Sequence, residues 1–173
     1  MSNRRNAVLL FVLIIAAMML LSIALNNENP TSKPKTYKTE TYKDDPKLTA
    51  VAEPSSGTVL SGQKFKESQI TVTAPSNAGC VVKLKTIDGD TRLMFYVRAG
   101  QTVTVGVPAE YLYVYFACGS TWYGKQDLFG AYTSYSKDDK VQDFMHYTWT
   151  YTLKPVTNGN FSETPVTKEE FFA

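Results

Sequence analysis

The sequence predicts an all-β domain, a small antiparallel β-sandwich or open barrel, behind one N-terminal transmembrane helix and a disordered stalk. Apolar and polar residues alternate with a period of two in several segments, turn residues separate these segments, and no convincing amphipathic helix follows residue 57. We divide the chain into a cytoplasmic tail (1–6), a transmembrane helix (7–25), a flexible linker (26–57) and a β-sandwich domain (58–173).

The transmembrane prediction depends on the uncharged apolar run at residues 7–25. As a helix this run would be about 28 Å long, close to the roughly 30 Å of a bilayer's hydrocarbon core. A cleaved signal peptide is the alternative, because Arg4 and Arg5 form a basic start and Ser22-Ile23-Ala24 resembles a cleavage pattern. The run is longer than the apolar region of most signal peptides, so we favour an uncleaved anchor in the cell membrane.

The charge of the N-terminal tail predicts its side of the membrane, and the composition of residues 26–57 predicts their flexibility. A short tail with two arginines resists translocation, so we expect the tail in the cytoplasm and the C-terminal domain outside it. Residues 26–57 are rich in proline, lysine and threonine and have few large apolar side chains, which is typical of a flexible stalk. Acidic residues between the lysines argue against a lipid-binding role for this stalk.

Six segments in the C-terminal part alternate as strands do. Asp88-Gly89-Asp90 predicts a hairpin turn between two of them, and Pro108 ends another. Near the C-terminus, Thr167 and Glu170 match a capping box, which supports at most one helical turn. The six segments are residues 69–74, 80–87, 91–98, 102–108, 110–118 and 147–155.

The two cysteines, Cys80 and Cys118, occupy inward positions of two different strands. They would be buried free thiols in a cytoplasmic domain. In an exported domain an inter-strand disulfide is the better interpretation, and this is the one we favour.

Residues 119–146 show little alternation but contain several aromatic side chains. Trp122, Tyr123 and Phe129 either close one end of the sandwich as plugs or form a contact surface for a partner. We favour plugs for Trp122 and Phe129. A second aromatic set alternates away from the inward residues and predicts an exposed binding face, and its members are Tyr111, Tyr113, Tyr115, Tyr96, Arg92 and Arg98.

Catalytic and metal-binding patterns are missing from the sequence. The single histidine, His146, has no evident nucleophile beside it, and no G-x-S-x-G motif occurs. Asp138 and Asp139 lack the spacing of a calcium loop, and a net charge of +2 gives little support for nucleic-acid binding. We therefore expect no enzymatic activity, no cofactor, no metal and no nucleic-acid partner.

Several segments resemble an uncharacterised bacterial domain family found behind single membrane anchors. The resemblance covers about residues 70–171, and its most specific parts are the WYG at residues 122–124 and the LFG at residues 128–130. It implies an all-β, envelope-facing accessory domain and no catalytic residues.

These observations leave two functional classes open. We expect a single-pass, extracytoplasmic binding or interaction module whose partner is another envelope protein or a cell-wall glycan. The alternative is a structural or assembly subunit of an envelope complex, and a carbohydrate-binding module is a less favoured third possibility.

Overall fold

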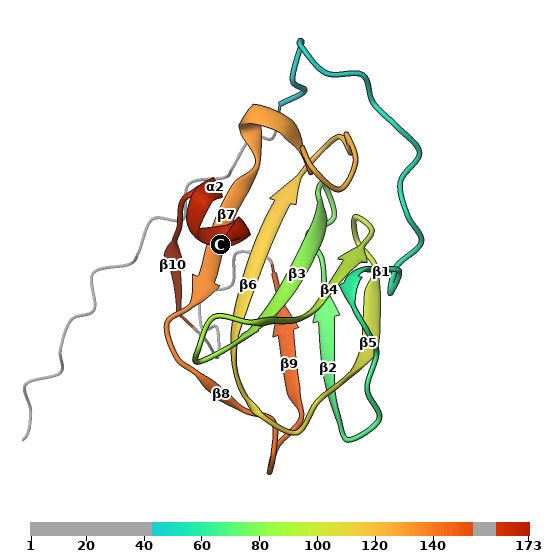
Figure 1. Ribbon diagram of the computed structural model, residues 1–173. Coiled ribbons are helices and arrows are strands. Elements are labelled where there is room, and N and C mark those ends of the chain that lie inside the picture. Colours follow the sequence, from blue (N-terminus) through green and yellow to red (C-terminus); the bar gives the residue numbers. More distant parts are fainter. Residues whose placement is uncertain (1–42, 154–161) are drawn as a thin grey trace, which may run out of the picture. The chain divides into compact units, whose positions relative to one another are not determined.

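The computed structural model describes residues 43–153 and 162–173, and these residues form an all-β domain with mostly antiparallel pairing (Figure 1). The predicted transmembrane helix and the first part of the predicted linker lie outside the described residues. Within the described ranges, no helix has the length and apolar character needed to cross a membrane.

The larger of two sheets has seven strands. Its main path has the spatial order β1, β4, β3, β6, β7, β10, and the short strand β8 (Gln142–Asp143) pairs with the beginning of β6. All pairs in this sheet are antiparallel. The main path consists of β1 (Val59–Gly62), β4 (Thr91–Val97), β3 (Gly79–Thr86), β6 (Tyr111–Gly119), β7 (Ser134–Asp138) and β10 (Glu163–Pro165).

The smaller sheet has the order β5, β2, β9, and its strands are β5 (Thr102–Val107), β2 (Ser68–Thr73) and β9 (Trp149–Thr152). β2 pairs antiparallel with β5 but parallel with β9, so the expectation of a wholly antiparallel arrangement is wrong at this one pair. Parallel pairing is possible because a long crossover connection separates the two strands in the sequence. The six predicted strands are all present, and β1, β7, β8 and β10 are additional.

Between the two sheets lies the first core, a sandwich-like layer of mainly aliphatic side chains. Alternate residues of β3, β4 and β6 face alternate residues of β2, β5 and β9, as the period of two predicts. Cys80 and Cys118 are register partners on β3 and β6, with Cα atoms 4.2 Å apart, and they form the predicted disulfide inside this core.

A second core covers the opposite face of the larger sheet. Trp122, Leu128 and Phe129 from the segment after β6, together with Phe171 from the C-terminal helix α2 (Lys168–Phe172), pack on β3, β4 and β6. Figure 1 shows α2 lying beside β7 in front of this sheet. The Thr167 side chain accepts a hydrogen bond from the Glu170 amide, which confirms the predicted cap.

Glycine makes room for the aromatic rings of this second core. Gly79, the first residue of β3, and Gly119, the last residue of β6, are register partners. A Cβ atom at Gly119 would lie 2.2 Å from Cβ of Phe129, and one at Gly79 would lie 2.3 Å from the Tyr96 hydroxyl. Because neither glycine has a side chain, Phe129 and Tyr96 can pack directly against the backbone at these two positions.

The described end of the predicted linker, residues 43–57, is packed onto the domain and is not a free stalk. The Val51 amide donates to the Trp122 carbonyl over 3.0 Å, and the Gly57 amide donates to the Tyr96 carbonyl over 2.7 Å. The Asp45 carboxylate accepts from the Lys47 and Ala131 amides, and these bonds lower the pKa of Asp45. The domain therefore begins before the predicted residue 58.

Candidate functional site

The predicted aromatic and basic face coincides with the second core, so much of it is covered. Tyr96 is 0% exposed and Tyr115 is 6% exposed, which contradicts the prediction that both rings face solvent. Tyr96 packs against Trp122 and Phe129, while Tyr115 packs edge-on against Phe171. Alternation correctly separated these tyrosines from the first core, but it could not show that a second layer covers them.

The other tyrosines of that predicted face remain more accessible. Tyr113 is partly buried against the second core, and Tyr111 is 46% exposed. Tyr111 lies at the beginning of β6, where it pairs with Asp143 of β8. The predicted set is therefore split between a packed layer and one end of the domain.

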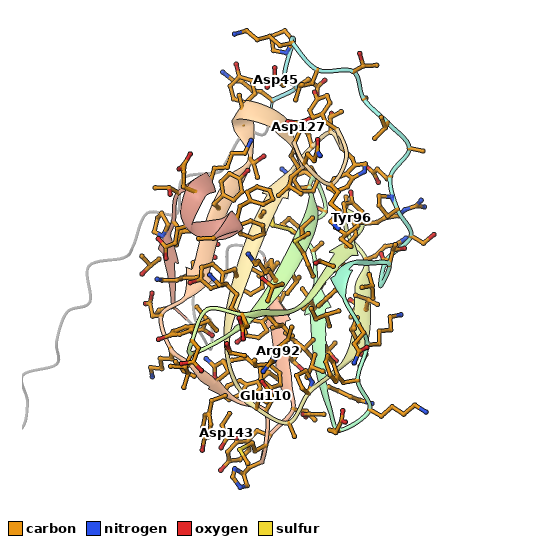
Figure 2. The ribbon with its side chains drawn as sticks, in the orientation of Figure 1. Asp45, Arg92, Tyr96, Glu110, Asp127 and Asp143 are labelled. Atoms are coloured by element: carbon orange, nitrogen blue, oxygen red, sulfur yellow. A yellow bond between two sulfur atoms is a disulfide. The ribbon has the colours of Figure 1, made fainter. Side chains whose placement is uncertain are left out.

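The two predicted arginines are engaged within the domain. Arg92 Nε lies 3.0 Å from Oε2 of Glu110, and Figure 2 shows these two residues side by side. Arg98 donates to the carbonyl oxygens of Pro54 and Glu53 and thereby holds the N-terminal segment against β4. The structure does not bring Arg92 and Arg98 together as one basic patch.

The segment after β6, residues 120–129, is called the plug segment here, because its rings pack on the sheet as favoured for Trp122 and Phe129. Trp122, Tyr123 and Phe129 are all buried, and the Tyr123 hydroxyl accepts a hydrogen bond from the Asp45 amide over 2.7 Å. Figure 2 places Asp45 and Asp127 together at this end of the domain. These rings are therefore packed against the domain in the structure, as a plug would be.

An open groove lies between the plug segment and α2, with a volume of about 660 Å³. Its floor is the outer face of the larger sheet. Ser61, Met94 and Lys83 are successive register partners across β1, β4 and β3, and Thr91 at the beginning of β4 also lines the groove.

The walls of the groove come from two segments far apart in the sequence. Lys125 and Gln126 line it from the plug segment, and Lys168, Glu169 and Phe172 line it from α2. Recesses with a few convergent polar groups and some apolar lining are the usual sites for small ligands. We refer to this recess, with its floor and both walls, as the lysine groove.

Lys83 is the buried basic group of the lysine groove. Its Nζ donates to the Phe171 carbonyl oxygen over 2.6 Å and lies 5.6 Å from the centre of the Phe171 ring. Burial, with a smaller contribution from Lys85, lowers the pKa of Lys83 to about 8. Lys83 thus both anchors α2 and brings a titratable ammonium to the floor of the groove.

A second lysine fixes α2 from the other side. Lys137 of β7 forms an ion pair with Glu170 at 2.7 Å, and the hydrogen bond to Glu170 raises the pKa of Lys137. Glu169 faces the groove, but hydrogen bonds from its own backbone amide and from Thr167 lower its pKa and direct its carboxylate towards the start of α2. The groove therefore carries more positive than negative side chains.

The sequence interpretation missed the residues of the lysine groove. Lys83 lies on the same face of the larger sheet as the predicted tyrosines, although on a different strand. This shared face was the only sequence signal that could have pointed to Lys83. Lys125 and Lys168 approach Lys83 only because the plug segment and α2 both fold onto one sheet face.

The opposite end of the domain carries an exposed apolar tip. The ends of β3, β6 and β8 meet there, because Leu112 pairs with both Thr86 and Gln142. Asp143 stabilises the turn after β8 by accepting from the Met145 and His146 amides, and it lies at the lower end of Figure 2. The tip consists of Ile87, Tyr111, Met145 and Tyr147, all of which are exposed.

Among the described residues, no group of three or more histidine, cysteine, aspartate or glutamate side chains is placed to hold a metal ion. Comparison of the chain with models of protein families, with curated proteins and with solved structures finds no match. The groove and the tip are therefore the two surfaces that bear on function.

Proposed function

We propose that this protein is a membrane-anchored, extracytoplasmic binding module without catalytic activity, and that it holds its ligand in the lysine groove. The observation that carries the proposal is the groove itself, an open recess of about 660 Å³ built by two added segments on the outer face of a sheet. Closing a sheet face requires only apolar cover, whereas this cover leaves a recess lined by lysine, hydroxyl and amide groups.

The location outside the cytoplasm has two supports. The Cys80–Cys118 disulfide is of a kind that persists in oxidising compartments and is rare in the cytosol. The apolar run at residues 7–25 has the length of a membrane anchor, with the basic tail before it. A reporter enzyme that works only outside the cytoplasm should be active when it is fused after Ala173. Activity of a fused reporter that works only in the cytosol would contradict this location.

A photo-crosslinking experiment on the full chain in its native cells tests the site. A photoreactive residue at Gln126 should capture a ligand from the groove wall. The same residue at Thr150, on the exposed outer side of the smaller sheet, is the matched control and should capture nothing. Crosslinks from Thr150 equal to those from Gln126 would refute a specific groove.

The alternative, a structural or assembly subunit, is favoured by one observation, the exposed apolar tip. Tyrosine and methionine are enriched where proteins contact each other. A third photoreactive position at Tyr147 separates the two functions. Capture of an envelope protein at Tyr147, with none at Gln126, would replace the binding module by the assembly subunit.

A further inference from the structure

We propose that the ligand of the lysine groove is a phosphate ester, with its phosphoryl group among Lys83, Lys125 and Lys168 and its organic part against Met94 and Phe172. This inference rests on the proposed function, because it names the class of ligand for the same site. It is carried by the charge, the donor types and the apolar lining of the groove.

The charge of the groove selects an anion. Three lysines line it against one acidic residue, Glu169, whose carboxylate is engaged at the start of α2. Lys85 lies on the same strand as Lys83 and adds positive potential, as its effect on the pKa of Lys83 shows. Concave sites lined by one sign of charge concentrate ligands of the opposite sign.

The donor types favour phosphate over carboxylate. The groove is lined by lysines and contains no arginine, and the lysine ammonium binds phosphate as a point charge without requiring a planar, two-pronged partner. Ser61 and Thr91 on the floor and Gln126 on one wall can donate further hydrogen bonds. Donors that arrive from the floor and from both walls suit a tetrahedral group of oxygens better than a planar one.

The Lys83 ammonium group has N–H donors left for this anion. An ammonium group has three N–H donors, and the Phe171 carbonyl accepts one of them. That bond also neutralises a carbonyl oxygen at the end of α2, which would otherwise repel an anion. The Lys83 side chain therefore contributes to the helix anchor and to the floor of the anion site at once.

The apolar lining favours an ester over inorganic phosphate. Met94 is buried in the floor beside Lys83, and the ring of Phe172 is 38% exposed on the α2 wall. Water next to the exposed Phe172 side chain is released when the organic part of an ester covers it, whereas inorganic phosphate leaves it in contact with water. Glycerol phosphate and a phospholipid head group share this chemistry.

The test is calorimetric titration of the full chain in a non-ionic detergent with three probes. These are inorganic phosphate, glycerol phosphate and a soluble short-chain phosphatidylglycerol, with short-chain phosphatidylcholine as the neutral-headgroup comparison. We expect both anionic esters to bind more tightly than inorganic phosphate. A preference for phosphatidylglycerol over glycerol phosphate would identify a lipid source, and the reverse would identify a soluble or polymeric one.

The matched variants all change exposed side chains, two pairs of lysines and one aromatic residue. Lys125→Gln with Lys168→Gln should weaken ester binding at least about ten-fold, since hydrogen bonds from a charged donor are stronger than those from a neutral amide. Lys64→Gln with Lys140→Gln removes the same charge from two exposed lysines outside the groove lining and should leave binding unchanged. Phe172→Ser should reduce the preference for esters over inorganic phosphate.

Each contrary result has a distinct meaning. Equal binding by the groove variant and the wild type overturns the phosphate site, as does equal affinity for inorganic phosphate and the esters. If none of the probes binds while Gln126 still crosslinks a ligand in cells, the phosphate class is wrong and the binding groove stands. If Gln126 captures nothing either, the proposed function fails as well.

Discussion

The two faces of the larger sheet are both buried, but by different means. The first core is mainly aliphatic and is covered by a second sheet, whose strands present alternate apolar residues to it. The second core is mainly aromatic and is covered by a loop segment and one helix of five residues. Large rings can bury as much surface with a few residues as a strand does with several.

This difference decides where a recess can form. Two sheets packed face to face interdigitate along their whole length and leave little free space. A plug and a short helix cover only the parts of the sheet beneath them, so the floor between them stays open. The lysine groove is therefore a consequence of the irregular cover on one face.

The largest expected effect tests whether the second core is as essential as the first. Phe129→Ala should lower the free energy of unfolding by about 3 to 5 kcal/mol, similar to the about 2 to 5 kcal/mol expected for Leu84→Ala in the first core. Both side chains are fully buried, so each truncation removes apolar burial and leaves a cavity. Chemical denaturation of the two variants measures both values.

Tyr132→Ala is the control for this comparison, because its ring lies in the same segment as Phe129 but is 46% exposed. It should change the free energy of unfolding by less than about 0.5 kcal/mol. A Phe129→Ala melting curve that overlays the wild type would show that the plug is an exposed contact surface and not a core.

A smaller effect is expected from the disulfide that lies in the first core. Replacing both Cys80 and Cys118 with alanine should destabilise the domain by about 2 to 4 kcal/mol, because the bond restricts the unfolded chain. β3 and β6 carry both cores, so plug and sandwich should unfold together in this variant. Trp122 lies in the second core and Trp149 packs against the first, so the fluorescence of Trp122 is followed in a Trp149→Phe background. A Trp122 transition separate from that of circular dichroism would show that the two cores are independent.

The smallest effect concerns the buried ammonium of the second core. In the unfolded chain Lys83 has the ordinary pKa of 10.5, and in the folded domain burial lowers its pKa to about 8. Between these values the unfolded chain binds more protons, so the free energy of unfolding should rise as the pH increases. Lys83→Met should lack this rise.

Melting temperatures of wild type and Lys83→Met from about pH 7 to about pH 9.5 measure this difference without the ionisation of tyrosine at higher pH. The melting temperature of the wild type should rise relative to that of Lys83→Met as the pH increases. Parallel curves would mean that Lys83 is as well solvated in the domain as in the unfolded chain.

Local patterns were sufficient to predict six strands, the inward positions of both cysteines and the cap of α2. Each depends on near neighbours in the sequence, such as the alternation around Cys80 or the Thr167 and Glu170 spacing. The short strands β7 and β10 were missed, because they are held by pairing with distant strands and have no clear alternation of their own. The exposed face predicted around Tyr96 and Tyr115 was wrong for the same reason, since its cover comes from elsewhere in the chain.

Side-chain alternation was enough to predict the all-β class and the inward residues of the first core, because it fixes which face of a strand each residue occupies. It also put Cys80 and Cys118 on inward positions, which favoured a disulfide in an exported domain but left two free thiols as the alternative. Which segments cover the other face depends on contacts between distant parts of the chain. Alternation gives a residue's side of the sheet but carries no information on what packs there. Lys83, Lys125 and Lys168 therefore became one groove only when the plug and α2 folded onto the same sheet.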